Sequence, residues 1–209
     1  SQRVVDLVHG ALAKAVPERV TAASCGTVMM ACFSGVQPTN GDPWIYIETI
    51  GGGFGARPNK DGLDGVHVHM TNTSNLPVEA LEVEYPLTVL RYELAEGSGG
   101  AGRYRGGLGL RRVYRAEADC RFEFDTSRIR SQPWGLFGGE KATGSQLDLG
   151  ADAKPLVLGQ GALDRGQIVT IQTPGGGGYG PAAERAREAV ARDVADGTIS
   201  AEASEALYG

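Results

Sequence analysis

The sequence lacks the features that mark membrane, secreted and nucleic-acid-binding proteins. No apolar run approaches the roughly 20 residues that a membrane helix needs. Residues 1–16 have neither the charged head nor the continuous apolar stretch of a signal peptide. The formal net charge is -5, and Lys and Arg form no basic block. Because nucleic-acid binders gather basic residues on one face, we expect no nucleic-acid partner and no membrane association.

Cysteine and histidine are also scarce, with three residues of each type. Cys25, Cys32 and Cys120 form no CxxC pair, and their odd number suits a reducing compartment, so we expect a cytoplasmic protein. No serine stands in the sequence context of a nucleophile elbow. The sequence therefore does not indicate a serine hydrolase of the common type.

Glycine is the residue in excess, with 32 copies gathered in a few dense clusters. It is not periodic as in collagen, and it is not mixed with Ser and Gln as in a flexible linker. The clusters lie inside sequence whose hydrophobic pattern is otherwise regular. Each cluster therefore needs a local structural reason.

The hydrophobic pattern predicts an α+β fold with an N-terminal helix, a β-rich middle with glycine-rich loops, and a C-terminal helical hairpin. We assign residues 1–180 to one domain and residues 181–209 to the hairpin. Val4, Val8 and Leu12 share one face of the first helix. This face would leave an apolar surface for a partner chain.

Strands are predicted where short apolar or alternating runs lie between turn residues. Residues 79–94 alternate around Pro86, which indicates two strands there. Alternation over 109–117 and 120–127 predicts a hairpin between these two strands. The remaining elements expected are strands over 27–34, 44–50, 155–160 and 167–174, a helix from Pro181 to Gly197, and a last helix over 201–207 capped by Ser200.

The first glycine cluster, residues 49–58, directly follows an expected strand. It superficially resembles a dinucleotide-binding fingerprint, but such a motif opens a long helix, and Pro58 forbids one here. The cluster instead predicts a loop whose glycines let the backbone approach another group closely or adopt positive φ. Arg57 could neutralise an anionic substrate group. The alternative is a tight turn between packed sheets.

A second informative segment, residues 61–75, carries two histidines and a polar run. On an expected strand His67 and His69 point to one face, because alternate residues share a face. Such pairs bind zinc, but His9 is the only further histidine and no cysteine stands at ligand spacing, so we assign no metal site. Substrate positioning or proton transfer fits the polar context better. A hydrogen-bonded structural role stays open.

Two further glycine clusters, residues 97–109 and 173–181, carry weaker signals. Arginines among the glycines of the first suit either an anion cradle or a long surface loop. The second precedes an expected helix, as anion sites do, but it lacks the lysine and the Ser/Thr of a P-loop. Residue patterns alone therefore support a glycine-rich α+β domain with a polar histidine segment.

At the level of whole motifs, the sequence resembles the hydantoinase B family. The resemblance begins with GGGFGARPNKDGLDGVHVHMTNTSNLPVEALEVEYPL, residues 51–87. It continues through residues 98–115, 133–139 and 173–180 and into the tail, so it covers essentially the whole chain in order. The family includes N-methylhydantoinase, 5-oxoprolinase, caprolactamase, and acetone and acetophenone carboxylases. Its members are considerably longer, and this chain resembles their C-terminal portion.

The resemblance implies a role in a multi-chain, ATP-dependent enzyme. A hydantoinase A-type subunit would bind ATP and Mg2+ and phosphorylate an oxygen of the small-molecule substrate, and the B-type subunit would act on the activated species. The expected partners are this A-type subunit and the N-terminal part of the B-type subunit, where the family's divalent-metal motifs lie. We expect His67 and His69 to be catalytic, and the expected substrate-binding residues are Gly51, Gly52, Gly53, Arg57, Asn72 and Asn75.

Three functions are compatible with these expectations. The first is ATP-dependent hydrolysis of a cyclic amide such as a hydantoin, 5-oxoproline or a lactam. The second is ATP-dependent carboxylation of a ketone, which uses the same activation by phosphorylation. The third is a non-catalytic assembly module. Burial of His67 and His69 far from any metal or cleft would favour the third.

Overall fold

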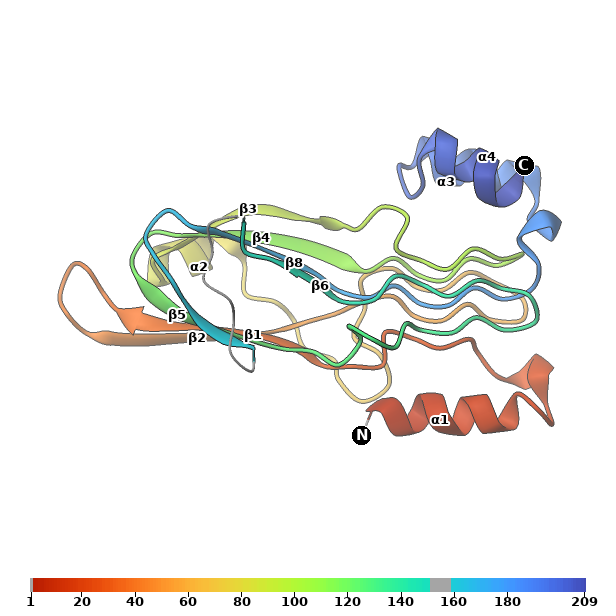
Figure 1. Cartoon of the computed structure of the whole chain (residues 1–209), viewed down its shortest axis with the longest axis horizontal. Helices are drawn as coiled ribbons and strands as arrows, with labels where there is room; N and C mark the ends of the chain where they lie inside the picture. Colours follow the sequence, from red (N-terminus) through yellow and green to blue (C-terminus); the bar gives the residue numbers. More distant parts are fainter. Residues whose placement is uncertain (1, 151–158) are drawn as a thin grey trace.

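The computed structural model describes residues 2–150 and 159–209. Two four-stranded antiparallel sheets form one end of the molecule, and extended glycine-rich segments continue from them to the other end (Figure 1). One helix lies along one side of these segments, and two C-terminal helices lie on the opposite side (Figure 1). The expected α+β class, with helices at both ends of the chain, is confirmed.

The first sheet has the strand order β2-β1-β5-β7. Strands β1 (Met29–Val36) and β2 (Pro43–Ile50) pair antiparallel and confirm the two strands expected there. Strand β1 also pairs with β5 (Cys120–Asp125), and β5 pairs with β7 (Gln160–Leu163). Residues 155–158 of the expected strand over 155–160 lie outside the described residues.

The second sheet has the order β3-β4-β8-β6. It consists of β3 (Leu87–Leu94), β4 (Leu110–Ala116), β8 (Ile168–Gln172) and the short β6 (Gln146–Asp148), which the sequence did not indicate. The predicted hairpin of β4 with β5 is wrong, because the turn between them carries the chain from one sheet to the other. Both strands bury alternate residues, and this pattern fits two facing sheets as well as one hairpin.

The core lies between the two sheets. Phe33 of β1 contacts the rings of Tyr114 and Phe122 at centroid distances of 5.1 and 5.0 Å, and all three side chains are buried. Such tilted aromatic pairs stabilise a core beyond the area that they bury. The inward-facing residues of both sheets therefore form one hydrophobic core.

Helix α2 (Val78–Glu84) replaces the first of the two strands expected over 79–94, and this prediction is wrong. Only Leu81 is buried in this segment, whereas Val83 is 88% exposed. The alternation of Leu81, Val83 and Tyr85 therefore did not report a buried strand face. The segment's glutamates are good helix formers, and Pro77 stands just before the first helical residue.

The glycine-rich segments run side by side without forming a sheet, and we call them the glycine bundle (22–25, 51–56, 61–65, 98–109, 133–143 and 173–180). Consecutive amides of Gly176, Gly177 and Gly178 donate to carbonyls of three different segments, those of Gly107, Ala23 and Glu140, at 2.8, 2.8 and 2.9 Å. This rotation of bonding direction is the geometry expected of extended helices with three residues per turn. Each segment is thereby bonded to several neighbours.

Close approach of backbones explains the glycines of the bundle. A Cβ atom on Gly106 would lie 1.6 Å from the carbonyl oxygen of Gly176, and one on Gly53 would lie 2.0 Å from that of Gly107. None of the glycines over 51–55 has a positive φ. Of the two reasons that the sequence suggested, close approach is therefore confirmed and positive φ is not used in this cluster.

The helices at the two ends of the chain are α1 (Gln2–Leu12), α3 (Arg187–Ala195) and α4 (Ala201–Tyr208). A helix was expected from Pro181, but one short 3-10 turn over Ala182–Glu184 precedes α3. The expected cap of α4 is confirmed, because the amide of Ala203 donates to Ser200 Oγ at 3.2 Å. In the part of the chain that the structure describes, no helix is both long and apolar enough to span a membrane.

Candidate functional site

Helix α1 buries its polar face and exposes its apolar face. Gln2 and Asp6 are buried against the rest of the chain, and His9 is half-buried on the same face. The opposite face is exposed to solvent and carries Val4, Leu7, Val8 and Leu12. The helix therefore brings polar side chains to the glycine bundle and leaves an apolar stripe without cover.

Asp6 is the centre of a buried polar group. Its carboxylate accepts from Arg128 Nη2 at 2.5 Å and from the amide of Ser24 at 3.3 Å. Asp6 and Arg128 have side chains that are only 5% and 4% exposed. Arg128 also donates to the carbonyls of Cys25 and Ser24 at 2.9 and 3.1 Å. These extra bonds offset the cost of burying the ion pair.

His69 faces the same carboxylate. Its Nε2 atom lies 3.5 Å from Asp6 Oδ1, and its side chain is 6% exposed. The ring packs against Phe54 at a centroid distance of 5.8 Å and against the edge of His9 at 6.1 Å. We call Asp6, His9, His69 and Arg128 the Asp6 cluster.

The backbone at His69 is strained. His69 has φ +62°, in the left-handed region that residues other than glycine seldom adopt. Such a conformation costs on the order of 1–3 kcal/mol and occurs often at functional sites, where surrounding contacts hold it in place. Here the contacts with α1 and Phe54 hold the imidazole under the helix.

The predicted strand that would place His67 and His69 on one face is wrong. Val66 forms an isolated bridge with Gly52, and the chain then turns at His69. His67 Nδ1 lies 3.1 Å from Thr71 Oγ1, which accepts from Gln2 Nε2 at 3.0 Å. Burial lowers the pKa of His67, against the opposing charge of Glu48. Both histidines thus reach the polar face of α1 through a turn.

A cavity of about 420 Å³ adjoins the Asp6 cluster, and we call it the Arg3 cavity. Gly26, with φ +57°, forms part of its wall, and a Cβ atom there would lie 2.1 Å from Asp6 Oδ2. The Asp6 carboxylate therefore lies against Gly26, a residue of the cavity wall that has no side chain. The full lining is Gln2, Arg3, Gly26, Thr27, Val28, Met70, Thr71 and Ser127.

A second buried polar group lies between the sheets and includes Asn75. Glu48 accepts from Arg112 Nη1 at 2.6 Å, from Asn75 Nδ2 at 2.8 Å, and from the hydroxyl of Tyr114. Tyr92 donates to Asn75 Oδ1 at 2.8 Å. Burial and the Glu48 charge raise the pKa of Tyr114, which therefore stays a hydrogen-bond donor. Asn75 and Glu48 also line a cavity of about 570 Å³.

The other expected substrate-binding residues lie elsewhere. Gly51, Gly52 and Gly53 are buried in the glycine bundle, where the amide of Gly52 donates to Val66 O at 2.9 Å. Arg57 donates to the carbonyl of Asp61 at 2.8 Å. Asn72 is exposed on the loop before α2. The structure thus brings His67 and His69 to one site, and it places Asn75 at another.

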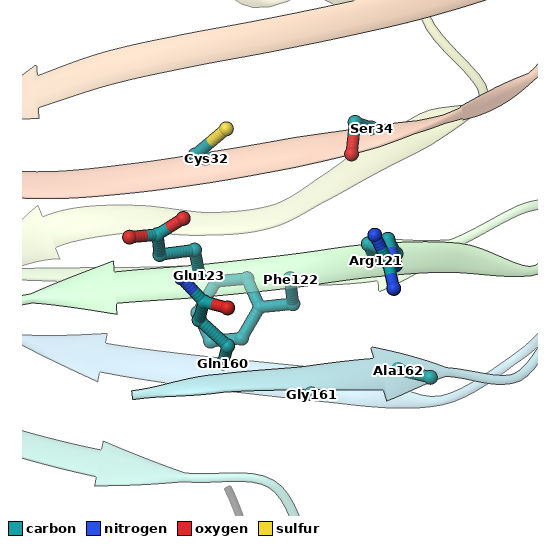
Figure 2. Close-up of a pocket in the computed structure, with 8 residues that line it drawn as sticks. All are labelled: Cys32, Ser34, Arg121, Phe122, Glu123, Gln160, Gly161 and Ala162. Carbon is teal, nitrogen blue, oxygen red and sulfur yellow. The ribbon is translucent and has the colours of Figure 1, made fainter. Parts of the chain in front are cut away.

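A third cavity, of about 470 Å³, lies on the outer face of the first sheet (Figure 2). Figure 2 shows Cys32 and Ser34 on β1, Arg121 and Glu123 on β5, and Gln160 on β7 around it. Burial raises the pKa of the Cys32 thiol, with a smaller contribution from the charge of Glu123. The thiol therefore stays protonated at neutral pH and is a weak nucleophile. This cavity is a poorer catalytic candidate than the Arg3 cavity.

The described residues do not fit the divalent metal that the family resemblance implies for the N-terminal part of the B-type subunit. Over residues 2–150 and 159–209, no group of three or more His, Cys, Asp or Glu side chains is arranged to hold a metal ion. The carboxylate beside His69 already binds the Arg128 cation at 2.5 Å. We therefore assign no chemical step in this chain to a metal.

No sequence motif marks Asp6, Arg128 or Arg3 as site residues. A signal existed in the first helix, because Gln2, Asp6 and His9 recur at spacings of four and three and so share a face. Burial of that face depends on Arg128, which is far away in the chain and carries no local pattern.

Comparison with known proteins decides the family. The hydantoinase B/oxoprolinase family model matches residues 1–182. The chain belongs to this family. An uncharacterized protein of Methanocaldococcus jannaschii is 45% identical over 203 residues, which is 96% of this chain and 35% of that protein. The beta chain of the caprolactamase of Pseudomonas jessenii is 30% identical over 222 residues, covering all of this chain and 38% of the relative.

Solved structures share the fold. The ATP-dependent caprolactamase from Pseudomonas jessenii matches with a TM-score of 0.79 and 28% identity over 95% of this chain and 37% of that chain. A nucleotide-free acetone carboxylase matches with a TM-score of 0.75 at 20% identity, over 94% of this chain and 31% of that chain, which shows the fold alone. The chain therefore spans about a third of the length of each of these four relatives.

Proposed function

We propose that this chain is part of the B-type subunit of an ATP-dependent cyclic-amide hydrolase. Its substrate would be a hydantoin, 5-oxoproline or a lactam that a partner A-type subunit has phosphorylated. The observation that carries the proposal is the match to caprolactamase, at 28% identity and a TM-score of 0.79 over 95% of this chain. The family name points to the same chemistry, since hydantoins and 5-oxoproline are cyclic amides.

The proposal includes partners that supply the other parts of the enzyme. ATP and Mg2+ would bind the A-type subunit, and a divalent metal would bind in the remaining two thirds of a B-type subunit. Two relatives, one named for a D-/L-hydantoinase and one for a caprolactamase, are each named as a single subunit of the enzyme, which supports a multi-chain assembly. We place the assembly in the cytoplasm, where the free thiols of Cys25, Cys32 and Cys120 would stay reduced.

Within this assembly we assign proton transfer to His69 and His67. Opening of a cyclic amide needs a base for the attacking water and an acid for the departing ring nitrogen. His69 lies 3.5 Å from the Asp6 carboxylate, which would stabilise the imidazolium formed when the ring takes a proton. Thr71 bonds His67 and also lines the Arg3 cavity, so it connects that histidine to the space where a substrate fits.

The expected substrate-binding residues take two kinds of role in this proposal. Asn75 lines a cavity and presents polar atoms beside Glu48. Gly51 and Gly52 would help to position His67 by letting two backbone segments pack closely. A Cβ on Gly51 would lie 2.9 Å from the carbonyl carbon of Val66, the residue before His67. Arg57 and Asn72 remain proposed substrate contacts.

A substrate panel tests the reaction type. The assembled enzyme is given ATP with hydantoin, 5-oxoproline or caprolactam, and ring-opened product and ADP are measured together. We expect ring opening that depends on ATP and needs no bicarbonate. Incorporation of labelled bicarbonate into a ketone substrate, with no ring opening on any cyclic amide, would show the carboxylase function instead.

A non-catalytic role has one observation in its favour, which is the low 6% exposure of the His69 side chain. A structural histidine is expected to be buried in this way. The substitution of His69 described below separates this role from catalysis, because it measures stability and turnover on the same protein.

A further inference from the structure

Arg3 presents a positive charge that no acidic side chain among residues 2–150 and 159–209 neutralises. Its Nη2 atom donates to Ser127 O and Ser127 Oγ at 2.8 and 2.9 Å, and its Nη1 atom donates to Ser131 Oγ at 3.3 Å. These partners are all neutral. The Nε atom is buried and has no partner. In the part of the chain that the structure describes, no carboxylate lies within ion-pair distance of Arg3.

The charged groups near Arg3 do not offset its positive charge. Arg128 lies close enough that the charge of Arg3, after burial, lowers the pKa of Arg128. Asp6 pairs with Arg128 at 2.5 Å, and this carboxylate therefore neutralises Arg128 and not Arg3. Burial keeps the pKa of His67 below its ordinary value, and this ring adds no charge at neutral pH. The wall around Arg3 therefore carries one unpaired positive charge.

The size and the lining of the Arg3 cavity suit a ligand with an anionic group. Its volume of about 420 Å³ lies in the range of about 300–1,000 Å³ that small-molecule sites occupy. Thr27, Thr71 and Ser127, which carry hydroxyl groups, also line the cavity, and Ser127 Oγ accepts from Arg3 Nη2 and donates to Thr27 Oγ1 at 3.0 Å. Arginine with several hydroxyl donors is a typical setting for a phosphoryl group, which has three acceptor oxygens.

We propose that the Arg3 cavity binds the phosphoryl group of the activated substrate. This inference rests on the proposed function, because it takes the phosphorylated substrate from it. Arg3 would be a binding residue that holds the phosphoryl oxygens. The Asp6 carboxylate lies directly behind Gly26, so the rest of the bound molecule would sit beside the cluster that contains His69.

Binding of inorganic phosphate tests the subsite directly. The affinity of the assembled, purified enzyme for phosphate is measured by calorimetry in the absence of ATP. We expect Arg3→Gln to weaken phosphate binding about tenfold or more, since a bond to a charged group is lost, and Arg3→Lys to weaken it less. Arg130→Gln is the matched control, because Arg130 is exposed and does not line the cavity. Equal phosphate affinity in wild type and Arg3→Gln would overturn the proposal.

Acetate separates the phosphoryl group from a substrate carboxylate, the other anion that an arginine would accept. We expect acetate to bind at least about tenfold more weakly than phosphate, because it offers fewer acceptor oxygens. Acetate binding that matches phosphate and is lost in Arg3→Gln would overturn the assignment to a phosphoryl group.

A measurement on the wild-type enzyme covers the case in which Arg3→Gln does not fold. Phenylglyoxal modifies accessible arginines, and mass spectrometry reports the rate at each position. We expect phosphate to slow modification of Arg3 and to leave Arg130 unchanged. Equal rates at Arg3 with and without phosphate would refute the subsite. Phosphate binding at Arg3 in an enzyme that opens no cyclic amide would keep the subsite and reject the proposed function.

Discussion

At the scale of single residues, burial sets the charge of the histidines in the site. Burial lowers the pKa of His9, with a further contribution from His69, and burial also lowers the pKa of His67. Both rings are therefore neutral in the folded protein at pH 7. A neutral imidazole accepts a proton, which is the property that a base needs.

These shifts predict that the folded state loses stability as the pH falls. The unfolded chain binds protons at the ordinary histidine pKa of 6.5, whereas His9 and His67 in the folded chain bind them only at lower pH. The stability that the two neutral histidines contribute is therefore fully present above pH 6.5. It is lost as the pH falls through their pKa values in the folded protein. Melting temperatures from pH 7.5 to 5 should fall in wild type and fall less in His67→Gln. Identical slopes in the two proteins would contradict the assignment.

Substitution of His69 separates catalysis from folding. In the complete assembly, His69→Gln should lower turnover by about 100-fold or more, because a positioned proton-transfer group contributes about 100- to 10,000-fold. The melting temperature should stay near that of wild type. Arg130→Gln is the control, since Arg130 is exposed and lies outside the Asp6 cluster. A lower melting temperature with normal turnover would show that His69 is structural.

At the scale of secondary-structure elements, the sequence predicts the strands that carry local patterns and misses the pairing between them. Strands β1, β2 and β8 and helix α4 follow from alternation, turn residues and a cap. Helix α2 does not follow from its local pattern, because three apolar residues in so short a run fit the period of a strand as well as that of a helix. The glycine bundle has no hydrophobic periodicity at all, since backbone atoms rather than side chains form its contacts.

At the candidate site, too, the sequence indicates single residues but not the contacts between distant segments. The histidines are visible in the sequence because they are rare and stand in a polar run. The contact of His69 with Asp6 joins positions far apart in the chain and depends on α1 packing with its polar face inward. Arg128 contacts Asp6 on this face, and the Trp134 ring lies close to Gly10, but no local pattern connects either residue to α1.

The bundle predicts a sharp difference between two glycine substitutions. Gly106→Ala should cost at least about 4 kcal/mol of folding stability, because the new Cβ would lie 1.6 Å from a backbone oxygen that cannot move alone. Gly10→Ala in α1 should change stability little. Its Cβ would meet only the Trp134 ring at 3.3 Å, and alanine favours the helix. Chemical denaturation measures both, and a Gly106→Ala protein as stable as wild type would disprove the close packing.

Arg185 is predicted to hold the C-terminal helices on the bundle. Its side chain is 2% exposed and pairs with Asp61 at 2.7 Å and with Asp193 at 2.7 Å. Arg185→Met should cost about 2–3 kcal/mol, less than for a fully buried pair because Asp61 is 36% exposed. Hydrogen exchange should quicken over 187–208, while the exposed Arg187→Met leaves it unchanged. Unaltered hydrogen exchange in Arg185→Met would show that Arg185 does not hold the C-terminal helices on the bundle.

At the scale of the whole molecule, the exposed face of α1 agrees with an assembly. Val4, Leu7 and Val8 are 57%, 71% and 50% exposed along one stripe. Exposed apolar patches of this kind usually mark interaction surfaces. The stripe lies on the opposite side of α1 from the Asp6 cluster, so a partner bound there would fix the helix that covers the site.

Turnover of the chain alone and in the complete assembly tests whether this chain is one part of an ATP-dependent cyclic-amide hydrolase. ATP-dependent ring opening of hydantoin, 5-oxoproline and caprolactam is measured with the isolated chain, with the A-type subunit and the rest of the B-type subunit, and with all parts combined. We expect ring-opened product and ADP only when all parts are present. Robust ring opening by the isolated chain, or a complete assembly that opens no cyclic amide with ATP, would contradict it.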